Sequence, residues 1–145
     1  MSDPGTHSRV VINCDGAARG NPGPAGAGAV VADPDGTVLV EIAEGLGETT
    51  NNVAEYTAAI LGLEAAQRLG AEDVLLRSDS QLMINQMTGR YRVKTAHLQP
   101  LHRRVSDLVR GFRRVEFEHV PRAENAEADR LANAGVDAWL AEPDV

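Results

Sequence analysis

The order of strand-like and helix-like segments constrains the fold of this 145-residue chain more than any other feature. Three segments that alternate apolar and polar residues come first, and segments with apolar residues at helical spacing follow. Two further strand-like runs separate the helical ones. The predicted strands cover residues 9–15, 27–32, 37–44, 73–78 and 114–120, and the predicted helices cover residues 52–69, 80–88, 100–110 and a segment from about 125.

This order, βββαβααβα, predicts an α/β fold with a mixed five-stranded sheet flanked by helices. Short turns join the first three strands, which should therefore be antiparallel, and the Gly- and Pro-rich residues 16–28 are predicted to be turns. We expect one domain over residues 9–141, preceded by a flexible N-terminus (1–8) and followed by a short tail (142–145).

Composition suggests a cytoplasmic monomer that does not depend on a membrane or a protein partner. The sequence is 43% hydrophobic and 24% charged, and no run approaches the roughly 18 apolar residues that cross a bilayer. Its start has neither the basic residues nor the apolar run of a signal peptide. The lone Cys14 cannot form an internal disulfide, which fits a reducing compartment.

Charge is distributed unevenly along the chain, whose net charge is −7. Residues 90–122 contain nine of the fourteen basic residues and only three acidic ones, so this segment carries +6 and the remainder carries −13. A basic segment beside an acidic body suits a phosphodiester substrate, although a solvated helix face would look the same.

Four acidic residues stand at positions where chemistry could be built. Asp15 and Asp79 end predicted strands, and Glu55 and Asp129 lie in the first turns of predicted helices. Carboxylates delivered to one point from strand ends and helix starts are what a hard divalent cation such as Mg²⁺ requires.

Each of these carboxylates also has a structural explanation. Asp15 before Gly16 could open a turn, Asp79 could cap the next helix, and Asp129 could oppose its helix dipole. Glu55 could belong to a capping box that starts at Asn52. None of these explanations accounts for the Asn, Thr, Gly and Gln residues that accompany the carboxylates.

Those companions resemble the motifs of the type 1 ribonuclease H family, in the same order and over nearly the whole chain. The four matching strings are Asp15-Gly16 with Gly20-Asn21-Pro22-Gly23-Pro24, Thr49-Thr50-Asn51-Asn52 before Glu55, Ser78-Asp79-Ser80-Gln81, and Asn125 through Asp129 to Leu131-Ala132.

The resemblance implies an endonuclease that hydrolyses the RNA strand of RNA–DNA hybrids and leaves 5′-phosphate and 3′-hydroxyl ends. Two Mg²⁺ ions, replaceable by Mn²⁺, would be held by Asp15, Glu55, Asp79 and Asp129, with Asp15 bridging both. It also implies that the hybrid is contacted by Gly16, Asn21, Thr50, Asn51, Asn52 and Gln81, with Thr50 on a DNA-strand phosphate and the amides in the minor groove.

The chain departs from the family pattern in two places. Many bacterial members carry a mobile catalytic histidine before the last aspartate, and an ungapped match would assign it to His119. Strand alternation instead places His119 on a sheet face with Phe117, so Arg122 or Glu124 could hold the loop position. The second departure is the lack of room for the basic-handle helix that some relatives insert, which leaves Arg90, Arg92 and Lys94 as a reduced hybrid-binding surface.

Two alternatives remain open from the sequence. A hybrid-binding module on the same fold could lack catalysis, although it would then be free to lose its carboxylates. A nuclease of this fold could also act on double-stranded RNA, because shape and 2′-hydroxyl contacts could accept that duplex. Integrases, transposases and resolvases on related folds lack these Thr-Thr-Asn-Asn and Gly-Asn-Pro-Gly companions.

Overall fold

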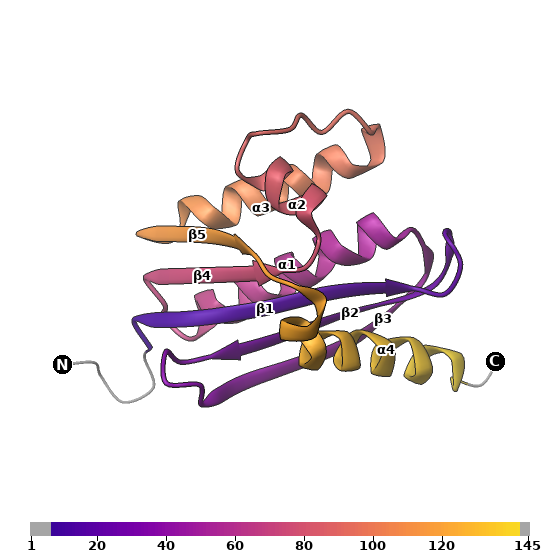
Figure 1. The fold of residues 1–145 in the computed structure, drawn as a ribbon, viewed down its shortest axis with the longest axis horizontal. Helices are drawn as coiled ribbons and strands as arrows, with labels where there is room; N and C mark the ends of the chain where they lie inside the picture. Colours follow the sequence, from indigo (N-terminus) through magenta and orange to yellow (C-terminus); the bar gives the residue numbers. More distant parts are fainter. Residues whose placement is uncertain (1–6, 143–145) are drawn as a thin grey trace.

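Three antiparallel strands begin the fold: β1 (Arg9–Ala18), β2 (Gly23–Ala32) and β3 (Val38–Thr49). After helix α1 (Asn51–Arg68), strands β4 (Asp73–Ser78) and β5 (Arg114–His119) join in parallel, giving the order β3-β2-β1-β4-β5 (Figure 1). The computed structural model describes residues 7–142, so most of the predicted flexible N-terminus and tail lies outside the described residues. The predicted mixed five-stranded α/β sheet is confirmed.

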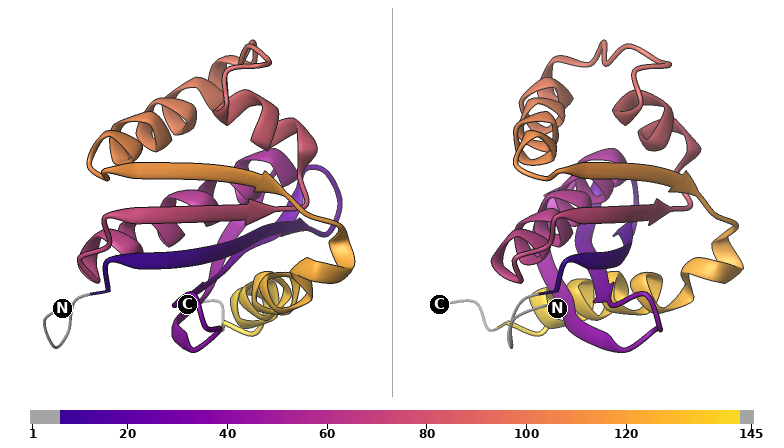
Figure 2. Two further views of the ribbon diagram at one scale, coloured as in Figure 1. Left: turned by 60° about the vertical axis from the view of Figure 1, so that its left-hand side comes forward. Right: turned by 90° about the vertical axis from the view of Figure 1, so that its left-hand side faces the viewer.

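Helices cover both faces of the sheet. Helix α1 and helix α3 (Gln99–Arg110) pack together on one face, and α4 (Ala126–Leu140) crosses the other face over β1, β2 and β3 (Figure 2). Between α2 (Gln81–Met87) and α3, the structure contains only a loop and the single turn η1 (Ala96–Leu98), in agreement with the missing basic-handle helix. None of the described helices has the length and apolar content needed to cross a membrane.

Small side chains allow α1 to lie close to the sheet. Val10, Ile12 and Cys14 form the inner face of β1, as their alternation predicts, and all three are buried. They meet the alanines of α1, and a Cβ on Gly62 would stand 2.7 Å from the Ile12 side chain. Cys14 is a buried free thiol whose pKa is raised by burial, so it belongs to the core.

The predicted turn over residues 16–28 is wrong in extent. Strand β1 continues to Ala18 and β2 begins at Gly23, while β3 extends beyond the predicted end at 44 to Thr49. Glycines in these segments suggested turns, but Gly26 serves close packing: a Cβ there would stand 2.2 Å from the carbonyl oxygen of Ala132 in α4. The short turns η1 and η2 (Arg122–Asn125) were not predicted, because three or four residues carry no periodic pattern.

Candidate active site

The four predicted carboxylates line one pocket of about 310 Å³. Strands β1 and β4 are parallel, so their carboxyl ends reach the same edge of the sheet; Asp15 lies within β1 and Asp79 directly follows β4. Glu55 comes from the second turn of α1 and Asp129 from the first turn of α4. Four elements of the fold therefore deliver one acidic side chain each to a common pocket.

Gly16 brings Glu55 close to Asp15. A Cβ on Gly16 would stand 2.3 Å from the backbone nitrogen of Glu55, a separation that no side chain tolerates. Only glycine at this position lets the start of α1 rest directly on β1. The predicted close approach at Gly16 is thus an approach of the protein's own backbone, and Gly16 also lines the pocket.

A second glycine places Asp129. Gly28 pairs with Asp15 across β1 and β2, and a Cβ on Gly28 would stand 2.3 Å from the carbonyl oxygen of Ala128. The first turn of α4 therefore rests on β2 at the level of Asp15, which puts Asp129 beside the other carboxylates.

The pocket concentrates negative charge. Burial, reinforced by the charges of Asp79 and Asp129, raises the pKa of Asp15 from its ordinary value of 3.8 to about 8. Burial also raises the pKa of Glu55, while hydrogen bonds from Ser80 and Asn51 partly oppose that rise; Asn51 Nδ2 donates to Glu55 Oε1 over 2.9 Å. Crowded carboxylates of this kind favour either a bound proton or a bound cation.

The donor set fits Mg²⁺, which takes oxygen ligands. Within residues 7–142, no three His, Cys, Asp or Glu side chains stand as a cage that could hold a metal by themselves. Mg²⁺ usually binds one or two carboxylates and completes its shell with water and substrate phosphates, so an open acidic pocket is sufficient.

The structure removes three of the four structural explanations for these carboxylates. Asp15 lies inside a strand and opens no turn. Thr50 caps α1 by accepting a hydrogen bond from the Val53 N–H over 3.3 Å, and Ser80 caps α2 in the same way, so neither Glu55 nor Asp79 is a cap. Asp129 does lie in the first turn of α4, where its negative charge interacts favourably with the positive end of the helix dipole.

The predicted hybrid-contacting residues divide into two groups. Asn21, Thr50 and Asn51 lie together, because Asn21 Oδ1 accepts a hydrogen bond from the Asn51 N–H over 3.1 Å and Thr50 precedes α1. Of these three, Asn51 lines the acidic pocket. Asn52, half-buried in α1, and Gln81, exposed at the start of α2, are not among the residues that line it.

His119 ends β5 and is exposed. The predicted placement on a face with a structural role is not seen, because β5 half-buries Val115 and Phe117 but leaves its last residue in solvent. His119 does not line the acidic pocket, whereas Arg122 does; the other candidate, Glu124, is exposed in η2.

Sequence reasoning missed two polar residues of the pocket. Asn133 donates from Nδ2 to the Asp129 carboxylate over 3.4 Å and accepts from Arg19 Nη2 over 3.3 Å. Arg19 is also paired with Asp137 over 2.7 Å. Asp129, Asn133 and Asp137 recur every four residues, so their common helix face was available as a signal.

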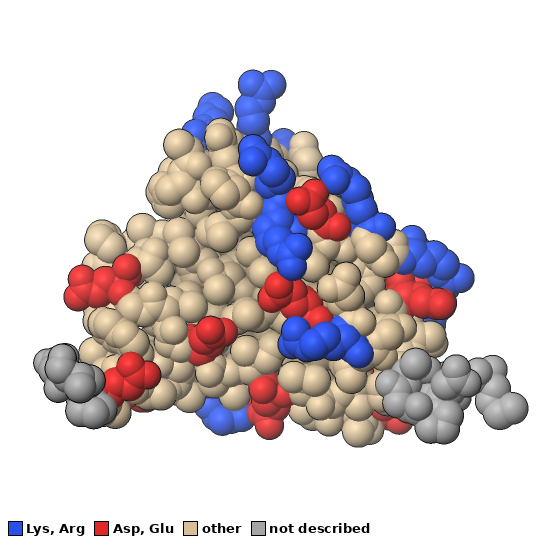
Figure 3. Space-filling model, turned by 180° about the vertical axis from the view of Figure 1, so that it is seen from behind, with Lys and Arg blue, Asp and Glu red and all other residues tan. Residues whose placement is uncertain are grey.

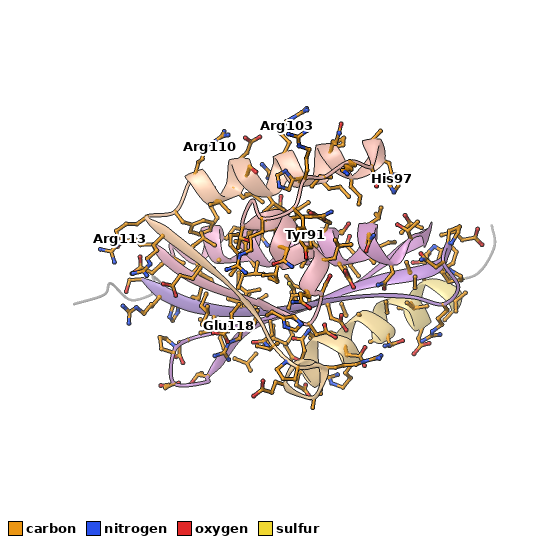
Figure 4. All side chains as sticks on the ribbon, turned by 45° about the horizontal axis from the view of Figure 1, so that its top comes forward. Tyr91, His97, Arg103, Arg110, Arg113 and Glu118 are labelled. Carbon is orange, nitrogen blue, oxygen red and sulfur yellow. The ribbon has the colours of Figure 1, made fainter. Side chains whose placement is uncertain are left out.

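The basic segment separates into paired and unpaired residues. Arg104, Arg110, Arg113 and Arg114 each form an ion pair with an acidic neighbour. Arg90, Arg92 and Lys94 lie in the exposed loop before η1 and form no ion pair with any described residue. Figure 3 shows basic side chains gathered over the top of the molecule, where this loop and α3 lie, and Figure 4 shows Arg103 and Arg110 pointing away from the body.

Comparison with known proteins identifies the family. A family model described as reverse transcriptase-like matches residues 13–135. Ribonuclease HI of Halobacterium salinarum is 44% identical over 134 residues, which cover 92% of this chain and 67% of that protein. The chain belongs to the ribonuclease H family. The resemblance to the type 1 family is thereby confirmed. The RNase H1 structure from the same archaeon matches this ribonuclease H fold with a TM-score of 0.87 at 45% identity. The match covers 90% of this chain and 98% of that one.

Other relatives extend the comparison. Bifunctional protein Rv2228c of Mycobacterium tuberculosis is 50% identical over 131 residues. The matched region covers 90% of this chain but only 36% of that longer protein. The structure of LC11-RNase H1 in complex with an RNA/DNA hybrid matches with a TM-score of 0.87 at 42% identity and covers 91% of this chain and 99% of that one.

Proposed function

We propose that this protein is a metal-dependent endoribonuclease that hydrolyses the RNA strand of RNA–DNA hybrids. The observation that carries the proposal is the meeting of Asp15, Glu55, Asp79 and Asp129 in one pocket of a ribonuclease H-family chain. A related protein, LC11-RNase H1, has been solved with a hybrid bound, which supports the same substrate class here.

The four carboxylates would hold two Mg²⁺ ions, for which Mn²⁺ could substitute. When bound, such ions lower the pKa of an attacking water and stabilise the departing 3′ oxygen, which yields 5′-phosphate and 3′-hydroxyl ends. The pocket's own part is to hold its carboxylates in place: Asn51 donates to Glu55 and Asn133 donates to Asp129. No side-chain nucleophile is needed.

The hybrid would lie across the pocket and reach the α2–α3 loop. Asn21, Asn51, Asn52 and Gln81 would face its minor groove, Gly16 would contact it from the lining of the pocket, and Thr50 would contact a DNA-strand phosphate. The exposed Arg90, Arg92 and Lys94, which form no ion pair with another residue of 7–142, would bind phosphates farther along the duplex. This surface is small, so we expect weaker binding than in relatives with a basic handle.

A cleavage comparison tests the proposal. Matched RNA–DNA hybrid, double-stranded RNA and double-stranded DNA are incubated with the protein and Mg²⁺, and the product ends are analysed. We expect cleavage of the hybrid's RNA strand with 3′-hydroxyl ends and no cleavage in EDTA. Binding without cleavage would indicate a non-catalytic module, and products with 2′,3′-cyclic phosphate would reject the mechanism.

A further inference from the structure

Asn125 is a fully polar side chain enclosed at the carboxyl edge of the sheet. It is 2% exposed and ends η2, directly before α4. Asparagine at this position commonly caps the following helix, but its side chain makes no cap hydrogen bond to α4. Its amide points instead toward the ends of β1 and β4.

Three hydrogen bonds satisfy this amide. Asn125 Nδ2 donates to the carbonyl oxygen of Cys14 over 2.9 Å and to Asp79 Oδ1 over 3.0 Å. Asn125 Oδ1 accepts from Asn13 Nδ2 over 3.2 Å. A carbonyl oxygen can only accept, so the atom facing Cys14 must be the amide nitrogen, and this fixes the orientation of the whole group.

One side chain thus connects two carboxylates of the pocket. Asp79 is held through its own Oδ1, and Asp15 is held through the backbone carbonyl that precedes it in β1. An amide is suited to this position, since it offers two donors to acceptors and brings no further negative charge. An aspartate of the same shape would offer no donor and would repel Asp79.

We infer that Asn125 is a positioning residue, which orients the Asp79 carboxylate and fixes the end of β1 so that the pocket can bind Mg²⁺. This inference rests on the proposed function for its catalytic consequence, but metal binding can be measured without substrate. Groups that orient metal ligands typically change metal affinity or activity by about 10- to 100-fold when removed.

The test compares Asn125→Ala with Tyr56→Phe. Tyr56→Phe removes another buried hydrogen bond, which the Tyr56 hydroxyl in α1 donates to Gln86 Oε1 in α2 over 2.7 Å. Mg²⁺ affinity is measured by chemical-shift titration of the full chain, melting temperature is measured in EDTA, and kcat and KM are measured on hybrid. Asn125→Ala should weaken Mg²⁺ binding by roughly tenfold or more and lower kcat with KM nearly unchanged. Tyr56→Phe should lower only the melting temperature.

A second variant covers the case in which Asn125→Ala does not fold. Asn13→Ala removes the hydrogen bond that Asn125 Oδ1 accepts and leaves the two bonds that Nδ2 donates, so it should weaken Mg²⁺ binding in the same direction by a smaller factor. Unchanged Mg²⁺ affinity in the folded variants would overturn the inference and leave Asn125 a structural residue. A wild-type protein that binds Mg²⁺ without cleaving hybrid would refute the proposed function alone, whereas one that binds no Mg²⁺ would overturn both.

Discussion

At the scale of single residues, the acidic pocket is a compromise between stability and metal binding. Asp15 is 7% exposed and Glu55 is 9% exposed, and both carry a raised pKa. Folding without metal therefore places carboxylates where their ionised forms are disfavoured.

Asp15→Asn and Asp79→Asn should each abolish detectable hybrid cleavage while the protein remains folded. Each change removes a ligand oxygen's charge and relieves repulsion, so the melting temperature in EDTA should hold or rise. Glu127→Gln is the matched control, because Glu127 shares the first turn of α4 with Asp129 but is exposed and outside the pocket. Near-native turnover by either Asn variant would refute the site assignment.

Stability in EDTA should depend on pH through Asp15. Its pKa of about 8 lies above the ordinary 3.8, so the folded state keeps a proton that the unfolded state has lost between these values. The free energy of unfolding should therefore fall as pH rises from about 4 to 8 and then level off. The free energy of unfolding, measured with urea at several pH values in this range, should fall less steeply with pH for Asp15→Asn than for Glu127→Gln. Equal pH dependences in the two variants would contradict the assignment of the raised pKa to Asp15.

His119→Ala should reduce turnover less than any carboxylate change, since the side chain is exposed and does not line the pocket. Arg122→Ala is the informative comparison, because Arg122 does line it. Single-turnover rates on hybrid at constant Mg²⁺ would rank the variants. A loss of several hundredfold in His119→Ala, at unchanged melting temperature, would instead establish His119 as catalytic.

At the scale of elements, glycines determine how closely the helices approach the sheet. Gly16 lets α1 pack against β1, and this contact brings Glu55 toward Asp15. Gly28 lets α4 pack against β2, and this contact brings Asp129 toward Asp15. The separation of the carboxylates therefore depends on packing between backbones.

Gly16→Ala should destabilise the protein by about 1–3 kcal/mol, because the new methyl group overlaps the α1 backbone. The displaced helix should also move Glu55 away from Asp15 and lower kcat. Gly111→Ala is the control, since a Cβ at the end of α3 would have its nearest neighbour at 3.3 Å. Chemical denaturation and cleavage rates measure both effects, and a Gly16→Ala protein as stable and active as Gly111→Ala would contradict this account.

Across the whole molecule, Arg19 and Arg122 line the acidic pocket, and the other basic residues of the described chain lie outside it. Most arginines of residues 103–114 are neutralised by acidic partners. These exposed ion pairs add little to the stability of the fold. The loop of Arg90, Arg92 and Lys94 keeps its charge available to a polyanion.

Replacing Arg90, Arg92 and Lys94 together by Gln should raise KM more than it lowers kcat and should flatten the salt dependence of binding by up to about three phosphate contacts. The control replaces Arg110, Arg113 and Arg114, which removes the same charge from paired positions. If the two triple variants had the same salt slope, only the overall field would matter. If the loop variant bound normally, the substrate surface would lie near Arg103, Arg104 and Arg122.

Patterns in the amino-acid sequence were enough to predict the order of the elements and the four acidic positions. Strand and helix periodicities are local, so Val10, Ile12 and Cys14 revealed their face without knowledge of their neighbours. The resemblance of four ordered motifs then indicated which acidic residues belong together. The glycines of residues 16–28 led to a wrong prediction of turns, because a turn and a close contact between backbones both favour glycine.

The side chains that support the pocket from outside the motifs could be identified only once the chain was folded. The amide of Asn125 could have capped α4, and nothing local distinguishes that role from hydrogen bonds to Cys14 and Asp79. The caps at Thr50 and Ser80 are local by contrast, since each hydroxyl accepts from an N–H three residues ahead, and they leave Glu55 and Asp79 to the pocket. The hydrogen bonds of Asn125 join residues 46 to 112 positions apart, and the parallel pairing of β1 with β4 places the ends of those strands, with Asn13 and Asp79, at one edge of the sheet.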